Sequence, residues 1–310
     1  MKIFDMHADI GFDVLRYQKL GMKDVLLTRH ADKCLKGEIS NICMACYFVG
    51  NESWEDMQEM VLALEDELNH QDVFHRVLTS ADLDVDQPLA VMSIEGMCGI
   101  QDNAEEKIQW LYDHGIRMGS LCWNEHNALA CGTGDEFGPG LSELGRRVIQ
   151  KMDELHMIID VSHANIQTMD DILELSTGLV VASHSNSRVL SDHRRNLTDE
   201  QARKIASKGG LIGLNAYSPF INLDYKKVRI ADLAAHAKYL SDLVGIDHIA
   251  CGFDLMDYFG DHDEYIIEDF VDASMGQNFV NGLREVGFSE EEVEKICFKN
   301  VVDCFKNYLR

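Results

Sequence analysis

Basic residues are scarce in this chain. Its 310 residues include 28 Lys and Arg against 53 Asp and Glu, which gives a formal net charge of −25. A protein that binds a nucleic acid backbone needs a stripe of cations to replace the counterions of the phosphates, and this composition argues against one. We take the acidity to favour solubility and give it no meaning for the substrate.

Long apolar runs are also missing. No uninterrupted apolar stretch approaches the ~18 residues of a membrane span. The first five residues lead straight into a charged strand end, without an apolar signal segment. The nine cysteines are scattered and odd in number, a pattern that suits free thiols in a reducing compartment. We therefore expect a soluble, cytoplasmic protein.

Prolines number only three, and no Gly-x-Gly-x-x-Gly fingerprint follows any apolar run, so an open dinucleotide-binding sheet gains little support. What the chain does contain is eight short apolar runs that alternate with segments of helical period. This alternation predicts a parallel sheet closed into a single-domain (β/α)8 TIM-type barrel over residues 1–310. The predicted strands are 2–9, 39–49, 89–96, 115–123, 157–164, 179–185, 210–217 and 248–254, and helices are expected at 54–69, 141–155, 230–243, 270–286 and 290–309.

Two histidines close neighbouring predicted strands. His163 and His184 each follow a serine at the end of an apolar run, and they lie 21 residues apart with a helix-length segment between them. A strand, helix, strand unit of that size is a parallel crossover, which brings both imidazoles to the carboxyl edge of one sheet. Chemistry in α/β folds is located at that edge. The pair therefore indicates a metal site at the C-terminal face of the barrel.

Further ligands of the same kind end other predicted strands. His7 and Asp9 have the i, i+2 spacing that puts two side chains on one face of a strand, and Glu95 ends the third strand. Imidazole and carboxylate donors suit Zn²⁺ and related divalent ions. Five ligands are too many for one open catalytic zinc. They predict two ions ~3.5–4 Å apart, bridged by Glu95.

These residues carry a resemblance to a known family. The segments that match in order are Asp5-x-His7-x-Asp9, Ile94-Glu95-Gly96, Asp160-x-Ser162-His163, Ser183-His184-Ser185 and Arg194-Arg195-Asn196-x-x-Asp199. Over nearly the whole chain, the sequence resembles the membrane (renal-type) dipeptidase family of zinc peptidases, within the broader group of metal-dependent amidohydrolase-like barrels.

The resemblance implies a role for each matching residue. His7 and Asp9 would bind the first zinc, and His163 and His184 the second, with Glu95 between them. Arg195 would receive the free carboxylate of the substrate's C-terminal residue, a task that suits a guanidinium.

One position departs from the family. Where relatives of the animal enzyme have a histidine after the fourth strand, this chain has Asn124, with His126 two residues later. Two replacements for that histidine stay open: Asn124 can still donate a hydrogen bond to a developing oxyanion, and His126 could reach into the site from the loop.

Asp254 ends the eighth predicted strand and completes the expected mechanism. A hydroxide bridging two zinc ions would attack the scissile carbonyl. Asp254 would accept the proton of the hydroxide and pass it to the leaving amine, as general base and then general acid. No serine or cysteine nucleophile motif competes for this role.

The expected reaction is hydrolysis of small dipeptides, among them dipeptides with a C-terminal D-residue, which related enzymes often accept. Two alternatives stay open. The same metal centre could hydrolyse other small amides, N-acyl amino acids or lactones. The chain could also be a metal-binding regulatory protein without activity, although a scaffold has no need of Arg195 or Asp254. Nucleic acid and membranes are not expected partners, and a homodimer would be an unsurprising assembly.

Overall fold

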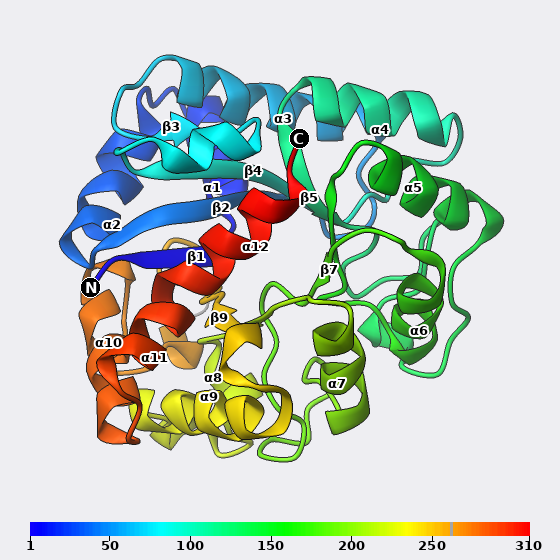
Figure 1. Cartoon of the computed structure of the whole chain (residues 1–310). Helices are drawn as coiled ribbons and strands as arrows, with labels where there is room; N and C mark the ends of the chain where they lie inside the picture. The colour runs from blue at the N-terminus through cyan, green and yellow to red at the C-terminus, as the bar shows by residue number, and fades with distance from the viewer. Residues whose placement is uncertain (261–262) are drawn as a thin grey trace. The chain divides into compact units, whose positions relative to one another are not determined.

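The computed structural model describes residues 1–260 and 263–310, in which strands alternate with helices along the chain (Figure 1). The strands are β1 (Ile3–Ala8), β2 (Ile39–Tyr47), β3 (His75–Arg76), β4 (Leu89–Glu95), β5 (Ile116–Ser120), β6 (Ile158–Asp160), β7 (Val180–Val181), β8 (Ile212–Leu214) and β9 (Ile249–Cys251). The helices are α1 (Ile10–Lys19), α2 (Asp32–Lys36), α3 (Trp54–Asn69), α4 (Ala104–Asp113), α5 (Glu143–Glu154), α6 (Ile166–Leu175), α7 (Asp199–Ser207), α8 (Ser218–Ile221), α9 (Ile230–Val244), α10 (Gly276–Glu285), α11 (Glu290–Glu294) and α12 (Asn300–Tyr308).

The strands form one sheet in the order β7-β6-β5-β4-β2-β1-β9-β8, with β3 added beside β4. Neighbours such as β4 and β5, or β8 and β9, run parallel. Ala182, the residue after β7, makes a parallel bridge to Ile212 in β8, so the two ends of the strand order meet. The fold is a nearly closed eight-stranded parallel barrel, and the predicted (β/α)8 architecture is confirmed.

Packing divides the chain into two compact units. Unit 1 contains Met1–Ala8, Leu26–Ile42 and Ala182–Phe305, and unit 2 contains Asp9–Val25, Cys43–Val181 and Lys306–Arg310. Both units are assembled from separate stretches of the chain, and β2 contributes residues to each. The expectation of a single domain over residues 1–310 stays a prediction.

The core of unit 1 is rich in aromatic rings. Phe4 of β1 meets Phe305 of α12 edge to face, with ring centroids 5.7 Å apart. Phe253, just beyond β9, packs against Phe270 at 4.8 Å and Phe279 of α10 at 5.3 Å. All five side chains are fully or almost fully buried. Each contributes about 1.5–3 kcal/mol by burial, so the segments that lead to the carboxyl ends of β1 and β9 rest on a rigid base.

The core of unit 2 is mostly aliphatic. The strands β4 to β7 pair in sequence order, and the buried face of α5 supplies Val148, Ile149 and Met152. Ser142 caps α5, because its hydroxyl accepts the Gly145 N–H at 3.0 Å. Parallel pairing of β4 with β5, β5 with β6 and β6 with β7 sets the register of these strands.

Several predicted helix boundaries are correct and two are wrong. The helix α3 spans residues 54–69 as predicted, and a capping box at Ser53 fixes its start. The helix expected at 270–286 begins only at Gly276, because the Asp272 side chain accepts the Ser274 N–H and holds a 3-10 turn over Ala273–Met275. The helix expected at 290–309 is divided by a π-helical turn at Lys295–Lys299 into α11 and α12.

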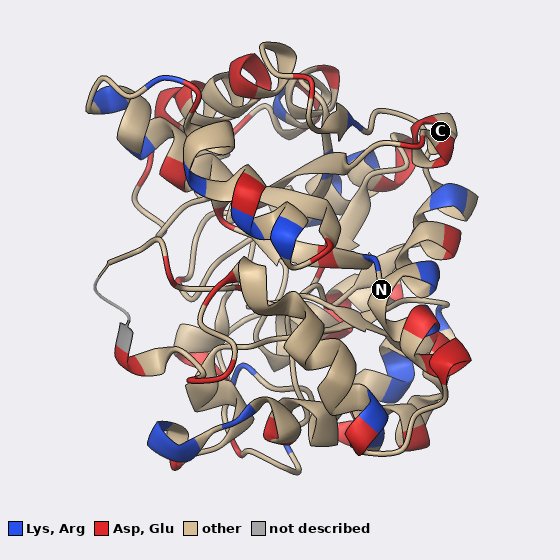
Figure 2. Cartoon of the chain, turned by 90° about the vertical axis from the view of Figure 1, so that its left-hand side faces the viewer, with Lys and Arg blue, Asp and Glu red and all other residues tan. Residues whose placement is uncertain are grey.

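Charged residues lie on many of the helices. Figure 2 shows Lys and Arg singly or in small groups among more numerous Asp and Glu. Among the residues that the structure describes, no helix is long and apolar enough to cross a membrane.

Candidate metal centre and substrate site

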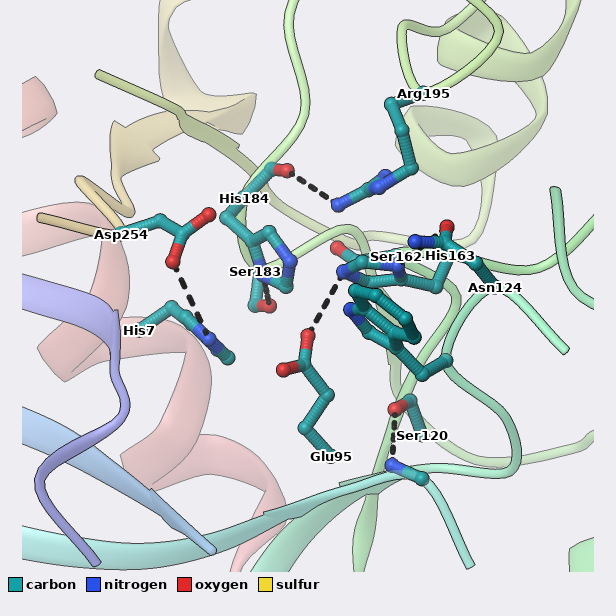
Figure 3. A network of polar contacts seen from close by, with 12 residues as sticks. His7, Glu95, Ser120, Asn124, Ser162, His163, Ser183, His184, Arg195 and Asp254 are labelled. Atoms are coloured by element: carbon teal, nitrogen blue, oxygen red, sulfur yellow. Dashed lines mark hydrogen bonds and ion pairs between the residues drawn. The ribbon is translucent and has the colours of Figure 1, made fainter. Parts of the chain in front are cut away.

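Two buried histidines face each other in unit 1. His7 lies in β1, and His184 lies three residues beyond β7 with no exposed surface. Their ring centroids are 3.9 Å apart, and each offers a ring nitrogen within 4.8 Å of the other. The Ser183 hydroxyl lies 2.7 Å from Nδ1 of His184 and orients that ring (Figure 3). Two buried imidazoles at this separation suit the binding of a cation.

Asp254 lies beside this histidine pair in unit 1. One of its carboxylate oxygens is 3.9 Å from Nε2 of His7 (Figure 3). The other accepts a hydrogen bond from the Asn215 amide at 3.0 Å. Its backbone is left-handed, with φ 53°, a conformation that costs a non-glycine residue about 1 kcal/mol or more and that clusters at functional sites. The side chain is 13% exposed. Asp254 is therefore an oriented carboxylate that stays accessible to a small molecule.

Asp5 is a buried carboxyl group to which the sequence interpretation gave no role. It accepts backbone N–H bonds from His7 at 3.2 Å and from Phe253 at 2.8 Å. Burial raises the pKa of Asp5 to about 7, although these two N–H bonds act in the opposite direction. Asp5 ties the end of β1 to the segment that leads into Asp254. The Asp-x-His spacing was visible in the sequence, but nothing there showed the second N–H donor.

Arg195 is almost completely buried in unit 1, with 4% of its surface exposed. Its Nη2 donates to the backbone carbonyl of His184 at 3.4 Å (Figure 3), and its guanidinium lies 5.3 Å from the ring centre of Phe220. A guanidinium has the planar donor geometry that pairs with a carboxylate.

Glu95 and His163 come together in unit 2. Glu95 is the last residue of β4, and its Oε1 lies 2.9 Å from Nε2 of His163 (Figure 3). Both side chains are buried. His163 lies beyond the end of β6 with φ 71°, so it belongs to a left-handed turn and not to the strand that the sequence predicted. Asp160 supports this turn, because its Oδ1 accepts the Ser162 N–H at 2.9 Å.

Asp9 also belongs to unit 2, but it is not a strand residue. The strand β1 ends at Ala8, and Asp9 occupies the position before α1 with φ −75° and ψ 42°. Alternation along a strand therefore does not apply to Asp9, because β1 ends before it. The binding of one ion by His7 and Asp9 stays a prediction. Asp9 is 4% exposed, and one of its carboxylate oxygens lies within 4.8 Å of a carboxylate oxygen of Glu95.

Asn124 contacts a candidate metal ligand. Its Oδ1 lies 3.1 Å from Nδ1 of His163 and accepts the Thr133 hydroxyl at 2.7 Å. A proton on Nδ1 of His163 satisfies this contact and leaves the lone pair of Nε2 for a cation, as expected for a metal-binding imidazole. His126 is exposed and pairs with Cys131 through the backbone. The sequence did not predict that Asn124 orients His163.

The donor atoms fit a divalent ion. Unit 1 brings together His7, His184, Arg195 and Asp254, and unit 2 brings together Asp9, Glu95, Asn124 and His163. The candidate ligands in both sets are imidazole nitrogens and carboxylate oxygens, the donors that zinc takes in catalytic sites. They are also buried, and a buried carboxylate needs a compensating cation.

Comparison with known proteins identifies the family. A family model described as membrane dipeptidase, peptidase family M19, matches residues 1–308. This chain belongs to the membrane dipeptidase family. An uncharacterised protein encoded in the pqqA 5′ region of Klebsiella pneumoniae is 31% identical over 244 residues, which cover 74% of this chain and 87% of that protein. An uncharacterised dipeptidase of Schizosaccharomyces pombe is 28% identical over 220 residues, covering 70% of this chain and about half (52%) of that protein.

A solved metallopeptidase structure has the same fold as the present chain. A metallopeptidase from Rhodobacter sphaeroides, determined with a phosphinate mimic of the dipeptide L-Ala-D-Ala, superposes with a TM-score of 0.88 at 22% identity. The superposition covers 99% of each chain. Its barrel and that of the present chain are the same fold.

Proposed function

We propose that this chain is a zinc-dependent dipeptidase that hydrolyses small free dipeptides, including dipeptides with a C-terminal D-residue. Membership of the dipeptidase family supports the reaction class. The dipeptide mimic bound by the Rhodobacter sphaeroides metallopeptidase supports the inclusion of L,D substrates.

The proposed metal ligands are the five residues that the sequence indicates. His7 and Asp9 would hold one zinc ion and His163 and His184 the other, with Glu95 bridging. When bound, the two ions supply an activated water molecule and polarise the carbonyl of the scissile bond. The remaining steps depend on the side chains around them.

One observation favours a dipeptidase over a general amidase. The Arg195 guanidinium is buried and donates to the carbonyl of His184, so a receptor for a carboxylate adjoins a proposed metal ligand. The free carboxylate of a dipeptide lies only a few bonds from the peptide bond that must be cut. An arginine at this place selects substrates whose C-terminal residue is free.

Asp254 moves the proton in this proposal. Its oxygen on the side of His7 accepts a proton from the attacking water and returns it to the leaving amine, while Asn215 holds the other oxygen in place. Asn124, whose oxygen orients His163, presents its amide nitrogen to the developing oxyanion.

The test compares free and blocked dipeptides on the zinc-loaded protein. The panel contains L,L, L,D and D,D dipeptides, their C-terminal amides and their N-acetyl derivatives. We expect turnover of free dipeptides and rejection of the amides. Arg195→Met should lower kcat/KM for free dipeptides by ~10²-fold, since it removes the partner of a buried charge. The same substitution should change kcat/KM for the amides little.

A matched control is Arg203→Met, because Arg203 lies on α7 in an exposed ion pair with Asp199. This variant should keep wild-type kcat/KM. Equal turnover of free and amidated dipeptides by the wild type would remove Arg195 from the site. Turnover of N-acyl amino acids or lactones without turnover of free dipeptides would favour the alternative amidohydrolase activity.

We also propose that the enzyme acts in the cytoplasm. All nine cysteines are free thiols and eight of them are buried, which supports a reducing compartment. Fractionation of cells with an antibody against the chain tests this.

A further inference from the structure

The turn that contains Arg195 is fastened to the segment that contains Phe220. The buried Asn196 side chain donates to the backbone carbonyl of Ser191 at 2.9 Å and to that of Phe220 at 2.7 Å. These two bonds hold the turn and α8 together within unit 1. The Arg195 guanidinium therefore meets the Phe220 ring as part of a fixed arrangement, 5.3 Å from the ring centre.

A second anchor holds the same two segments. His236 of α9 is buried, accepts the Ser187 N–H on Nδ1 at 3.1 Å and donates from Nε2 to the carbonyl of Ile221 at 2.9 Å. Ser187 begins the loop that leads to Arg195, and Ile221 ends α8. The overall path of both segments is thus set by groups other than the side chains of Arg195, His193 and Phe220.

His193 lies between these two segments and contacts both. Its Nδ1 accepts the backbone N–H of Arg195 at 3.2 Å, and its ring packs on Phe220 with centroids 4.5 Å apart. Only a neutral imidazole has a lone pair on Nδ1 to accept this bond. The ring is neutral at physiological pH, since burial, followed by the charges of Arg195 and Arg194, lowers the pKa of His193 to about 4.

We propose that His193 and Phe220 are positioning residues for Arg195: they hold its guanidinium in the orientation that receives the free carboxylate of the substrate. This inference rests on the proposed function of Arg195. His193 fixes the backbone of Arg195, and Phe220 supports the face of the guanidinium. Neither residue touches the reacting atoms.

The residue type explains why a histidine occupies this place. A lysine or arginine at position 193 would repel Arg195, and an acidic residue would form an ion pair with it and compete with the substrate carboxylate. A neutral histidine provides an acceptor for the backbone N–H and leaves the positive charge of Arg195 for the substrate.

Three variants test this assignment in the full-length, zinc-loaded protein. His193→Leu removes the acceptor at similar bulk, His193→Asn keeps an acceptor at the position of Nδ1, and Phe220→Leu removes the ring face. His248→Leu is the matched control, because His248 is also partly buried and also bonds a backbone group, the Gly210 carbonyl at 2.9 Å, outside the site.

The readout is the ratio of kcat/KM for a free dipeptide to kcat/KM for its C-terminal amide. We expect His193→Leu and Phe220→Leu to lower this ratio by ~10-fold, mainly through KM for the free dipeptide, because the carboxylate contact exists before and during the reaction. His193→Asn should restore the ratio to within ~3-fold of wild type. The control should leave it unchanged.

Crystal structures of the zinc-loaded variants supply a second measurement that is independent of turnover. In His193→Leu we expect the Arg195 guanidinium to leave its place over Phe220. An Arg195 that keeps its wild-type conformation would overturn the positioning role, and so would an equal loss of kcat/KM for free and amidated substrates. If the wild type itself fails to distinguish them, the proposed function fails, and the Arg195 conformation in the variants still decides the role of His193.

Discussion

Replacement of Asp254 by asparagine separates proton transfer from everything else at the site. Asparagine has the size of aspartate and is among the residues that best tolerate a left-handed backbone, so the φ of 53° at this position should persist. Its amide oxygen can still accept the Asn215 hydrogen bond that Asp254 accepts at 3.0 Å. The negative charge is lost, and with it the ability to take up and release a proton.

The expected effect on turnover is large. General acid–base catalysis contributes typically ~10²–10⁴-fold, so kcat of Asp254→Asn should fall by ~10²-fold or more. The free energy of unfolding should change by less than ~1 kcal/mol, because the backbone conformation and the hydrogen bond are retained. Zinc content per chain, measured by atomic absorption after dialysis, should equal that of the wild type.

A matched control lies three residues further along the chain. Asp257 forms an ion pair with Lys33 at 2.6 Å, and Asp257→Asn should keep wild-type kcat. Near wild-type turnover of Asp254→Asn would show that this carboxylate is not the proton carrier. Loss of zinc together with activity would show instead that Asp254 holds the metal.

Three other perturbations follow from the geometry. Asn124→Ala removes the group that orients His163, so zinc affinity in a competition assay with a chelator should fall ~10–100-fold, and unchanged affinity would refute that role. Gly96→Ala should lower the free energy of unfolding in urea by ~1–2 kcal/mol, because φ is +83° and the new Cβ would lie 3.0 Å from the Phe48 carbonyl oxygen; a stable variant would contradict this. The pKa of His193 is about 4 in the folded protein, below the ordinary value of 6.5. Between pH 6.5 and pH 4 the unfolded chain therefore binds a proton that the folded protein does not, so stability falls as the pH drops through this range. The loss is ~1–2 kcal/mol after a discount for partial exposure, and it should be absent from His193→Asn; equal pH dependence of both proteins would refute it.

The sequence predicts the barrel well because the repeated pattern is strong. Eight apolar runs gave eight strands of the barrel, since buried parallel strands show up as short continuous apolar stretches. The two-residue β3 was missed because it is too short to form a pattern. The π-helical turn at Lys295–Lys299 was missed for another reason: its residues keep the helical hydrophobic pattern on either side.

The identity of the site residues was easier to predict than their backbone conformation. His163 and Asp254 were expected at the ends of strands, but both lie in left-handed turns beyond them. A residue with a side chain gives no sign of positive φ in the sequence, because the strain is compensated by contacts elsewhere. The residues that orient the site side chains by hydrogen bonding cannot be predicted from the sequence either. Asn215 and Thr133 reach Asp254 and Asn124 only once the fold exists.

The bond between Phe253 and Asp5 has a consequence for how the protein is made. The two residues are 248 positions apart in the chain: Asp5 lies in the first strand of the barrel, and Phe253 lies just beyond the last strand. At about 5–20 residues per second, a ribosome needs roughly 12–50 s to supply the second partner after the first. During that time the nascent β1 has no β9 to pair with, and His7 has no Asp254 beside it. A chain that terminates before β9 would therefore carry all five of its proposed zinc ligands and still lack the Asp254 carboxylate that the proposed reaction needs.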